Sequence, residues 1–473
     1  MMPYISSRMY SMYIFNSLSK QKEEFIPMNP GKVGLYSCGP TVYDYVHVGN
    51  LRSFMLSDFV RRAMEYQGYE VLQVMNITDV GHLVSDGDHG DDKMTKALRR
   101  EGKEITLENM LEVADFYAER FKEDLLKLNV LIPQHLPKAS DHILEDIEII
   151  KNLEAKGFAY TTSDGVYFDT AKMPDYGKLG GVQINDAGES RIDVVSEKKN
   201  NADFALWKLD AANGWQSPWG QGFPGWHIEC SGMSMKYLGE QFDIHTGGSD
   251  LRTIHHNNEI AQSECSTGCT PFVTYWMHGE MLNFGGEKLS KSTGGNITLQ
   301  TLAEKGFSPM AYRYLTLQTH YRSPMNFTWE ILEAAKNGIE NIYRDIVSLR
   351  ASARPEEAPD EIFQKDFLTK IEDDINLPQA LAVFHAIFKS DLSPAKKLAT
   401  IYDCDRVFGL GLEEYEPATI TISEDIQKLL DQRQQAREEK DWNLSDTLRD
   451  EITEMGFEVL DTPNGQEVRP LLS

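Results

Sequence analysis

The stretch "KVGLYSCGPTVYDYVHVGNLRSF", which runs from Lys32 to Phe54, decides the fold. Its opening part, up to Cys38, is predicted to form a short buried strand that ends in a turn containing glycine and proline. Apolar residues then recur at roughly helical spacing, namely at Leu51, Phe54, Met55, Phe59, Ala63 and Tyr66. A second strand is predicted for "EVLQVMNIT", from Glu70 to Thr78. The order strand, helix, strand indicates a parallel α/β unit.

The turn between the first strand and the helix carries residues that suit ligand binding. In parallel units, ligands bind at the carboxyl ends of strands and the amino ends of helices. Cys38 lies at such a strand end, and His47 to Asn50 lie at such a helix start, where the helix dipole favours an anion. Gly49 lets a nucleotide base or sugar lie against the backbone. The alternative interpretation is an ordinary capped helix with an incidental histidine.

Length and composition limit the class of protein. The 473 residues are too many for one core and indicate about three domains of ~150 residues. No apolar run reaches the roughly 18 residues that cross a membrane, and we expect no secretory signal at the N-terminus. Five cysteines are few and odd in number, which argues against a disulfide framework and favours a reducing, cytoplasmic compartment. The net charge of −26 speaks against a general nucleic-acid coat but leaves room for a local basic track.

The rest of the chain divides by its patterns. Amphipathic helices are predicted over 105–128 and 140–156, and the segment 176–224 has the composition of loops and short strands. The chain is mostly helical after Ser308, with linker-like breaks at 352–361 and 413–423.

A second group of candidate site residues lies in "GWHIECSGMS" and "HTGGSDLRTIHHNNEIAQ". His255 and Glu259 are four residues apart, so on a helix they share a face, and this spacing is typical of half a zinc site. Cys230 precedes them, and a set of Cys38, Cys230, His255 and Glu259 suits zinc, which accepts sulfur, nitrogen and oxygen ligands. For an isolated pair, the better interpretation is a surface pair beside buried apolar cysteines. The neighbouring motifs favour the metal.

A third motif is "KLSKS", from Lys288 to Ser292, followed by "TGGN". Its two lysines suit polyphosphate binding, because ammonium groups offset the negative charge that builds on an α-phosphate during displacement. Taken alone, such a string is better interpreted as a solvated charged loop.

In this order and at these distances the motifs resemble those of the cysteinyl-tRNA synthetases, which are class I aminoacyl-tRNA synthetases. The resemblance runs from about Tyr13 to the C-terminus and includes "NITD", "YWMHGEMLNFGGEKLSKS" and "DDINLPQALAVF". His47 to Asn50 correspond to the signature HIGH, with Asn50 in place of the second histidine. Lys288 to Ser292 correspond to KMSKS, with Leu289 in place of methionine. After Asp79, "VGHLVSDGDHGDDKMTKAL" is longer and more acidic than the family pattern.

The resemblance implies a division of the chain into domains. A Rossmann-like catalytic domain with a parallel sheet would span 13–345, with an inserted connective region at about 125–222 and the KLSKS loop at 288–292. A helical bundle domain would span 346–415 and a small anticodon-binding domain 416–473, and residues 1–12 would form an N-terminal extension.

The resemblance also implies a two-step reaction. Cysteine would be activated by ATP to cysteinyl adenylate and then transferred to the terminal adenosine of tRNA(Cys), with Mg²⁺ accompanying ATP, in a cytoplasmic enzyme that is a monomer. The implied catalytic residues are His47, Asn50, Lys288 and Lys291. ATP would be bound by His47, Gly49, Asn50, Asp250 and Lys291.

The implied metal is one Zn²⁺ held by Cys38, Cys230, His255 and Glu259. The thiol of the substrate would bind it as thiolate, and this would distinguish cysteine from serine better than packing, which separates such pairs by only ~1–3 kcal/mol. Trp226 and His245 are candidates for the wall of the cysteine pocket, with core positions as the alternative.

In the last domain, Arg437, Trp442 and Asp446 are the candidates for anticodon contacts. The alternative there is a solvated helical face with one buried tryptophan.

Two other functions remain open. One is a related ligase that joins cysteine to an amino sugar in mycothiol synthesis. That ligase lacks the complete anticodon unit, whereas this chain extends past Phe408 into a segment that resembles one. The other is a non-catalytic RNA-binding paralogue, which we would expect to have lost a metal ligand or a KLSKS lysine.

Overall fold

The computed structural model of the chain describes residues 11–80, 93–180, 197–285, 287–288, 297–353, 357–417, 423–462 and 465–470. Three of the predicted features therefore fall wholly or mostly outside the described residues. They are the N-terminal extension, the acidic segment after Asp79, and positions 289–292 of the KLSKS motif.

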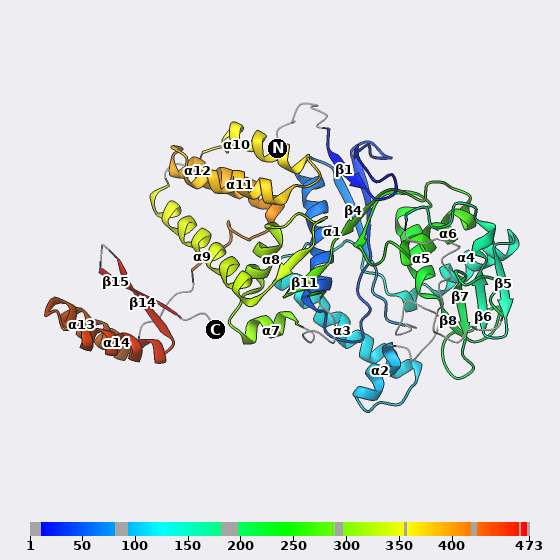
Figure 1. Cartoon of the computed structure of the whole chain (residues 1–473), viewed down its shortest axis with the longest axis horizontal. Helices are drawn as coiled ribbons and strands as arrows, with labels where there is room; N and C mark the ends of the chain where they lie inside the picture. The colour runs from blue at the N-terminus through cyan, green and yellow to red at the C-terminus, as the bar shows by residue number, and fades with distance from the viewer. Residues whose placement is uncertain are drawn as a thin grey trace.

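The centre of the molecule is a four-stranded parallel sheet in the order β10-β9-β3-β4 (Figure 1). Its strands are β3 (Lys32–Ser37), β4 (Glu70–Met75), β9 (Phe242–Gly248) and β10 (Val273–Gly279). The predicted strand, helix, strand unit is confirmed as β3, α1 (Val48–Tyr66) and β4. The chain leaves β3 toward β4 on one side and later returns to β9 on the other. The carboxyl ends of β3 and β9 thus flank the point where the strand order reverses, which is where open α/β sheets bind ligands.

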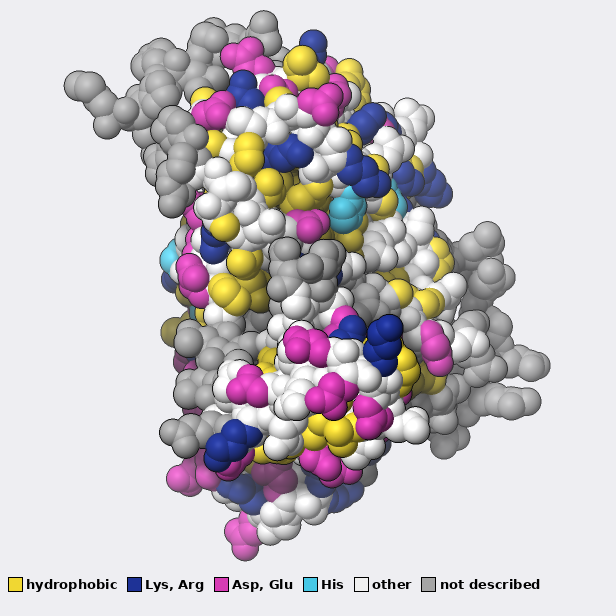
Figure 2. Space-filling view, turned by 90° about the vertical axis from the view of Figure 1, so that its left-hand side faces the viewer, with side chains coloured by type: hydrophobic (Ala, Val, Ile, Leu, Met, Phe, Trp, Pro, Cys, Tyr) yellow, Lys and Arg dark blue, Asp and Glu magenta, His cyan; other side chains and the backbone are white. Residues whose placement is uncertain are grey.

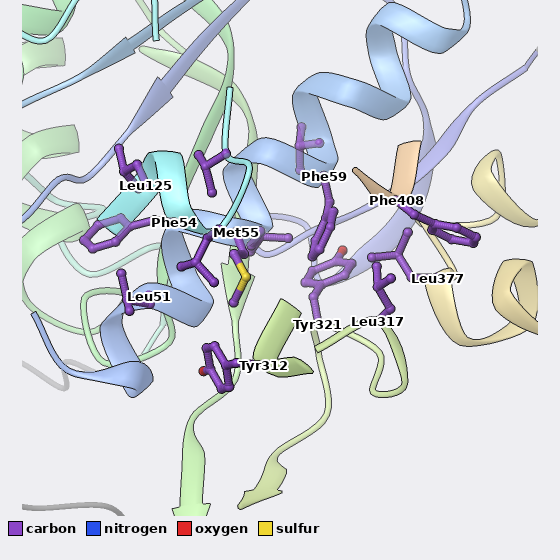
Figure 3. Packing of buried hydrophobic residues seen from close by; sticks show 14 of the residues in the cluster. Leu51, Phe54, Met55, Phe59, Leu125, Tyr312, Leu317, Tyr321, Leu377 and Phe408 are labelled. Atoms are coloured by element: carbon purple, nitrogen blue, oxygen red, sulfur yellow. The ribbon is translucent and has the colours of Figure 1, made fainter. Parts of the chain in front are cut away.

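Helix α1 begins at the predicted motif because His47 caps it. The His47 side chain accepts a hydrogen bond from the Asn50 backbone N–H, which supplies one of the partners that the first turn of a helix lacks. The face of α1 that carries Leu51, Met55 and Phe59 packs into the largest buried cluster (Figure 3). This cluster also takes in Leu125 of α3 (Leu107–Lys127) and Phe408, the last residue of α12 (Pro394–Phe408). α1 is therefore held along its length by the core of the molecule.

The connection from β4 to β9 contains the inserted elements. Helices α2 (Lys93–Arg100), α3 (Leu107–Lys127) and α4 (Ile143–Ala155) come first, with a 3-10 turn at Ala139–Asp141. An antiparallel sheet follows in the order β5-β6-β7-β8, with strands β5 (Ala159–Thr162), β6 (Gly165–Phe168), β7 (Phe204–Leu209) and β8 (Gly222–Pro224) and a 3-10 turn at Thr170–Lys172. The two helices predicted here are confirmed as α3 and α4. α5 (Trp226–Leu238) and α6 (His255–Thr267) then flank β9 in sequence.

Smaller elements surround the central sheet. Near the N-terminus, β1 (Tyr13–Asn16) and β2 (Gln21–Glu24) form a hairpin. After β10, β11 (Leu282–Phe284) pairs with β12 (Glu287–Lys288) and β13 (Met325–Phe327).

The part of the chain after β12 is mostly helical, as predicted. It contains α7 (Leu299–Glu304), α8 (Pro309–Leu317), α9 (Trp329–Ser352), α10 (Glu361–Ile371), α11 (Leu377–Phe388) and α12 (Pro394–Phe408). The predicted domain boundary at residue 345 lies within α9, which is one continuous helix.

A buried ion pair joins this helical part to α1. Arg313 of α8 and Asp58 of α1 are both fully buried, and their Nη2 and Oδ2 atoms are 2.6 Å apart. Arg313 also donates to the carbonyl oxygens of Phe408 and Leu128, at 2.7 Å each. One guanidinium therefore connects α1, the end of α3 and the end of α12.

The last unit has a separate small core and lies apart from the sheet (Figure 1). It consists of α13 (Glu424–Glu438), α14 (Trp442–Glu454) and a hairpin of β14 (Phe457–Thr462) and β15 (Gly465–Pro470). Figure 2 shows acidic and basic side chains interspersed on the side of the molecule where this unit lies.

Candidate active site

The predicted metal ligands come together at the carboxyl end of the central sheet. Cys38 follows β3, Cys230 lies on α5, and His255 and Glu259 lie one turn apart on α6. All four are buried, and their ligating atoms lie within 4.8 Å of one another. His255 Nε2 is 3.0 Å from Glu259 Oε1, because the two side chains share a helix face. The surface pair that we considered as the alternative is wrong, since both side chains are almost wholly inaccessible.

The chemistry of these four donors fits a metal ion. Two sulfurs, one imidazole and one carboxylate form a set that transition metals bind, and the group could hold a metal ion without further ligands from the chain. A buried carboxylate and thiolate are costly without a cation between them. The burial of all four is therefore itself an argument for a bound cation.

The charges of the group influence one another strongly. A hydrogen bond from Cys38 to Cys230 lowers the pKa of the Cys230 thiol to about 6, even though burial opposes this. Burial and the same hydrogen bond raise the pKa of Cys38. Burial works against ionisation of Glu259, but His245 and His255 outweigh it and lower its pKa to about 2. The Cys230 thiolate and the Glu259 carboxylate are the forms that bind a metal. Burial opposes protonation of His255, but Cys230 and Glu259 outweigh it and raise its pKa to about 10, so a metal would displace a proton from this ring.

Further histidines orient the predicted ligands. His227 Nδ1 lies 2.8 Å from His255 Nδ1, and His245 Nε2 lies 3.0 Å from Glu259 Oε2. Contacts of this kind fix the tautomer and the orientation of a ligand. His245 is fully buried and stacks on Trp276 at 4.5 Å between ring centroids. It therefore contacts the metal-ligand candidate Glu259 from inside the core.

Sequence reasoning missed a second overlapping group, formed by Cys38, His245, His256 and Glu259. His256 Nε2 is 3.3 Å from Cys38 Sγ, and His256 Nδ1 is 2.7 Å from His278 Nε2. The doublet "HH" at 255–256 was the available signal. Burial lowers the pKa of His256, and it lowers that of His278 to about 3, so both rings are neutral at physiological pH.

The "NITD" motif supports the turn that carries Cys38. Gly39 packs so closely that a Cβ there would lie 1.7 Å from the Asn76 carbonyl oxygen, and its N–H donates to Asn76 Oδ1 at 2.8 Å. Asn76 Nδ2 donates to Thr78 Oγ1, which in turn donates to Glu229 Oε2 at 3.1 Å. Glu229 precedes Cys230, so one chain of hydrogen bonds connects the residues that adjoin the two cysteines.

A cavity of about 190 Å³ opens beside the metal group. Its lining includes Cys38 and His255 of the metal group, Asn50 at the start of α1, and Asp250. Trp226, which we predicted for this wall, lines the cavity, and its ring centroid is 4.5 Å from that of His255. His245, the other predicted wall residue, does not line this cavity.

A second cavity, of about 230 Å³, adjoins the first and shares Thr41 and Asn50 with it. It is lined by His47 and the loop that precedes α1. Since His47 Nδ1 accepts the N–H of Asn50 at 3.3 Å, a neutral His47 carries its proton on Nε2. Nε2 is then a donor, which is what binding a phosphate oxygen requires. Gly49 is half-buried in the same turn.

The KLSKS motif is described only at its start. Lys288 is the last residue of β12, where its backbone pairs with Asn283. Lys291 lies outside the described residues.

The three candidate anticodon residues lie close together in the last unit. Arg437 of α13 bonds Asp461 at 2.8 Å, and its guanidinium is 5.9 Å from the ring of Trp442. Trp442 begins α14 and is 57% exposed, so the alternative of a buried tryptophan is wrong. Asp446 follows one turn later and pairs with Arg449 at 3.1 Å.

Two family models match the chain. One describes the class I tRNA synthetase (C) catalytic domain and matches residues 24–337. The other describes the anticodon-binding domain of cysteinyl-tRNA ligase and matches residues 421–469.

Similar curated proteins extend over nearly the whole chain. The cysteine–tRNA ligase 1 of Burkholderia lata is 44% identical over 96% of both chains. The cysteine–tRNA ligase of Treponema denticola is 41% identical over 94% of this chain and 97% of its own. Among solved structures, Mycobacterium tuberculosis methionyl-tRNA synthetase bound by methionyl-adenylate matches with a TM-score of 0.54 at 13% identity, over 80% of this chain and 90% of that one. That likeness concerns the fold. Among the described helices, none combines the length and the apolar character needed to cross a membrane.

Proposed function

Since the chain belongs to the family of cysteine–tRNA ligases and is an aminoacyl-tRNA ligase, we propose that it activates L-cysteine with ATP and transfers it to tRNA(Cys). The observation that carries the proposal is that the group of Cys38, Cys230, His255 and Glu259 opens into a cavity that continues to His47 and Asn50. A thiol-binding end and a phosphate-binding end thus adjoin, as a reaction between an amino acid and ATP requires.

The residues at the start of α1 would bind ATP. The Nε2–H of His47 and the side-chain amide of Asn50 would donate to phosphate oxygens at the amino end of the helix, where the dipole favours anions. Gly49 leaves room beside the backbone for the nucleoside. Asp250, exposed beyond β9 and part of the cavity wall, would accept from ribose hydroxyls. Lys288 and Lys291 would stabilise the charge on the α-phosphate, and Mg²⁺ would accompany ATP.

The metal group would select the substrate by its sulfur. When bound, Zn²⁺ supplies a soft Lewis acid that favours a thiolate over a serine hydroxyl. His227 and His245 hold His255 and Glu259 in place, and Trp226 closes one side of the cavity.

The decisive experiment measures exchange of labelled pyrophosphate into ATP by zinc-loaded protein, with L-cysteine or L-serine. We expect exchange with cysteine and almost none with serine, followed by transfer of cysteine to tRNA(Cys). Transfer to an amino sugar in place of tRNA would favour the mycothiol-type ligase. An absence of exchange from folded, metal-loaded protein would favour a non-catalytic RNA-binding protein.

We propose that Arg437, Trp442 and Asp446 contact the anticodon, with the exposed ring of Trp442 stacking on a base. Such a stack contributes about 1–3 kcal/mol, so Trp442→Ala is expected to raise the KM for tRNA(Cys) by about 5- to 150-fold. Pyrophosphate exchange should stay unchanged, because α14 packs in a core separate from the sheet. Leu444→Ala is the matched control, since Leu444 is apolar and 47% exposed on the same helix but cannot stack. Equal effects of the two variants would contradict the assignment.

A further inference from the structure

One cation of the described chain lines both cavities. Lys93, the first residue of α2, is part of the wall of the cavity that ends at the metal group, and also of the cavity that contains His47. Among the lining residues of these two cavities, all of which the structure describes, no other lysine or arginine occurs. A site for a carboxylate and a triphosphate needs positive charge. Lys93 is the residue in the described chain that supplies it where the cavities meet.

Within the described residues, the ammonium of Lys93 contacts two aromatic rings and no carboxylate. It lies 5.6 Å from the ring centroid of Trp226 and 5.7 Å from that of Tyr43. Aromatic faces at this distance attract a cation and leave its charge intact. Within the described ranges, no carboxylate forms an ion pair with it at the 4.0 Å limit.

The helix that carries Lys93 is anchored at its other end. Arg100, the last residue of α2, bonds Asp44 Oδ2 and the Tyr43 carbonyl oxygen at 2.9 Å each. Met94, Ala97 and Leu98 are buried beneath the helix. The loop that lines the second cavity and the helix that presents Lys93 are therefore one unit, so the ammonium is positioned before any ligand binds.

Because Lys93 lines both the cavity of the metal group and the cavity of His47, its position identifies its ligand, if the proposed function holds. The side chain of the amino acid would lie at Cys38 and His255, and the phosphates at His47 and Asn50. The carboxylate must then lie between them, where both cavities include Lys93.

We propose that Lys93 is a further catalytic residue, which binds the carboxylate of the amino acid and holds it against the α-phosphate of ATP. In the step, a carboxylate oxygen forms a bond to the α-phosphorus. The bond from that phosphorus to the oxygen bridging to the β-phosphorus breaks, and pyrophosphate leaves with the electron pair. Lys93 stays protonated throughout and transfers no proton.

The test compares Lys93→Gln with Lys96→Gln in the full-length, zinc-loaded protein. Lys96 lies on the same helix, is exposed and lines neither cavity, so the control makes the same change of charge on the same helix. Lys93→Gln is expected to lower kcat/KM for cysteine-dependent pyrophosphate exchange by about 100-fold or more, and Lys93→Arg should recover part of it. Lys96→Gln should match the unsubstituted protein. Equal rates for the two glutamine variants would overturn the proposal.

A binding measurement isolates the carboxylate and does not depend on turnover. Cysteamine has the thiol and amine of cysteine but no carboxylate. Lys93→Gln should weaken binding of L-cysteine by about 10-fold or more and leave cysteamine binding unchanged. Equal losses for both ligands would mean that Lys93 only supports the pocket, and unchanged cysteine binding would remove it from the carboxylate site; either result overturns the proposal. If the unsubstituted protein shows no cysteine-dependent exchange, the proposed function fails, and these binding ratios still decide whether Lys93 binds the carboxylate.

Discussion

Cys230→Ser is expected to remove most of the metal from the protein and to lower kcat/KM for cysteine by more than about 100-fold. Loss of a residue that only orients a ligand costs about 10- to 100-fold, and Cys230 is itself one of the four converging donors. Its thiol ionises readily, with a pKa of about 6. A serine hydroxyl at the same place stays protonated and offers a hard oxygen, which is a poorer partner for zinc.

Metal content from mass spectrometry, measured together with pyrophosphate exchange, checks this result. Cys265→Ser is the control, because Cys265 lies near the end of α6, on the same helix as His255 and Glu259, but outside the metal group. It should keep its metal and its activity. Unchanged metal content in Cys230→Ser would remove that residue from the site, while equal losses in both variants would point to general unfolding.

Asp58→Asn is expected to lower the free energy of unfolding by about 3–5 kcal/mol. Asp58 accepts from Arg313 at 2.6 Å, from Arg62 at 2.9 Å and from the Leu131 N–H at 2.8 Å. The amide keeps the shape of the side chain but removes the carboxylate charge that is hydrogen-bonded to the buried guanidinium of Arg313. Because that guanidinium connects α1 to the ends of α3 and α12, the loss should also loosen the helical part from the catalytic sheet.

Urea unfolding and limited proteolysis measure the two effects. Glu70→Gln is the control, since Glu70 pairs with Lys32 at the surface with 73% of its side chain exposed, and such pairs contribute below about 1 kcal/mol.

The pH dependence gives a second test. Burial opposes ionisation of Asp58, but Arg313 and Arg62 outweigh it and lower its pKa. Its stabilisation is therefore present above the pKa of the unfolded state and is lost as the pH falls through the folded-state value. Asp58→Asn should lack this acid-dependent loss, and a loss equal to that of the unsubstituted protein would contradict the assignment.

Local patterns in the sequence were sufficient for the elements that position the site. The strand before Cys38 and the helix after His47 were predicted because a short apolar run before a turn and helical spacing of apolar residues are both visible within a few neighbouring residues. The pairing of His255 with Glu259 was predictable for the same reason, since a four-residue spacing on a helix places both on one face. The order of the motifs along the chain then indicated the family, and two family models and the curated relatives bear this out.

Other features depend on which segments pack together. Nothing near Lys93 in the sequence indicates that its ammonium lies over Trp226, because the two residues come from different inserted elements. The support of Glu259 by His245 and the contact of His256 with Cys38 also join residues from separate strands and helices.

The sequence by itself determined the parallel unit, the helix that begins at His47 and the identity of the four metal-ligand candidates. Only the tertiary structure decided that these four converge beside a cavity that Lys93 also lines. It also decided that Arg313 and Asp58 form an ion pair inside the molecule. The physical reason is that periodicity and capping act over one or two helical turns. The approach of Cys38 to Cys230, by contrast, is set by the order of strands in the sheet and by the burial of the side chains between them.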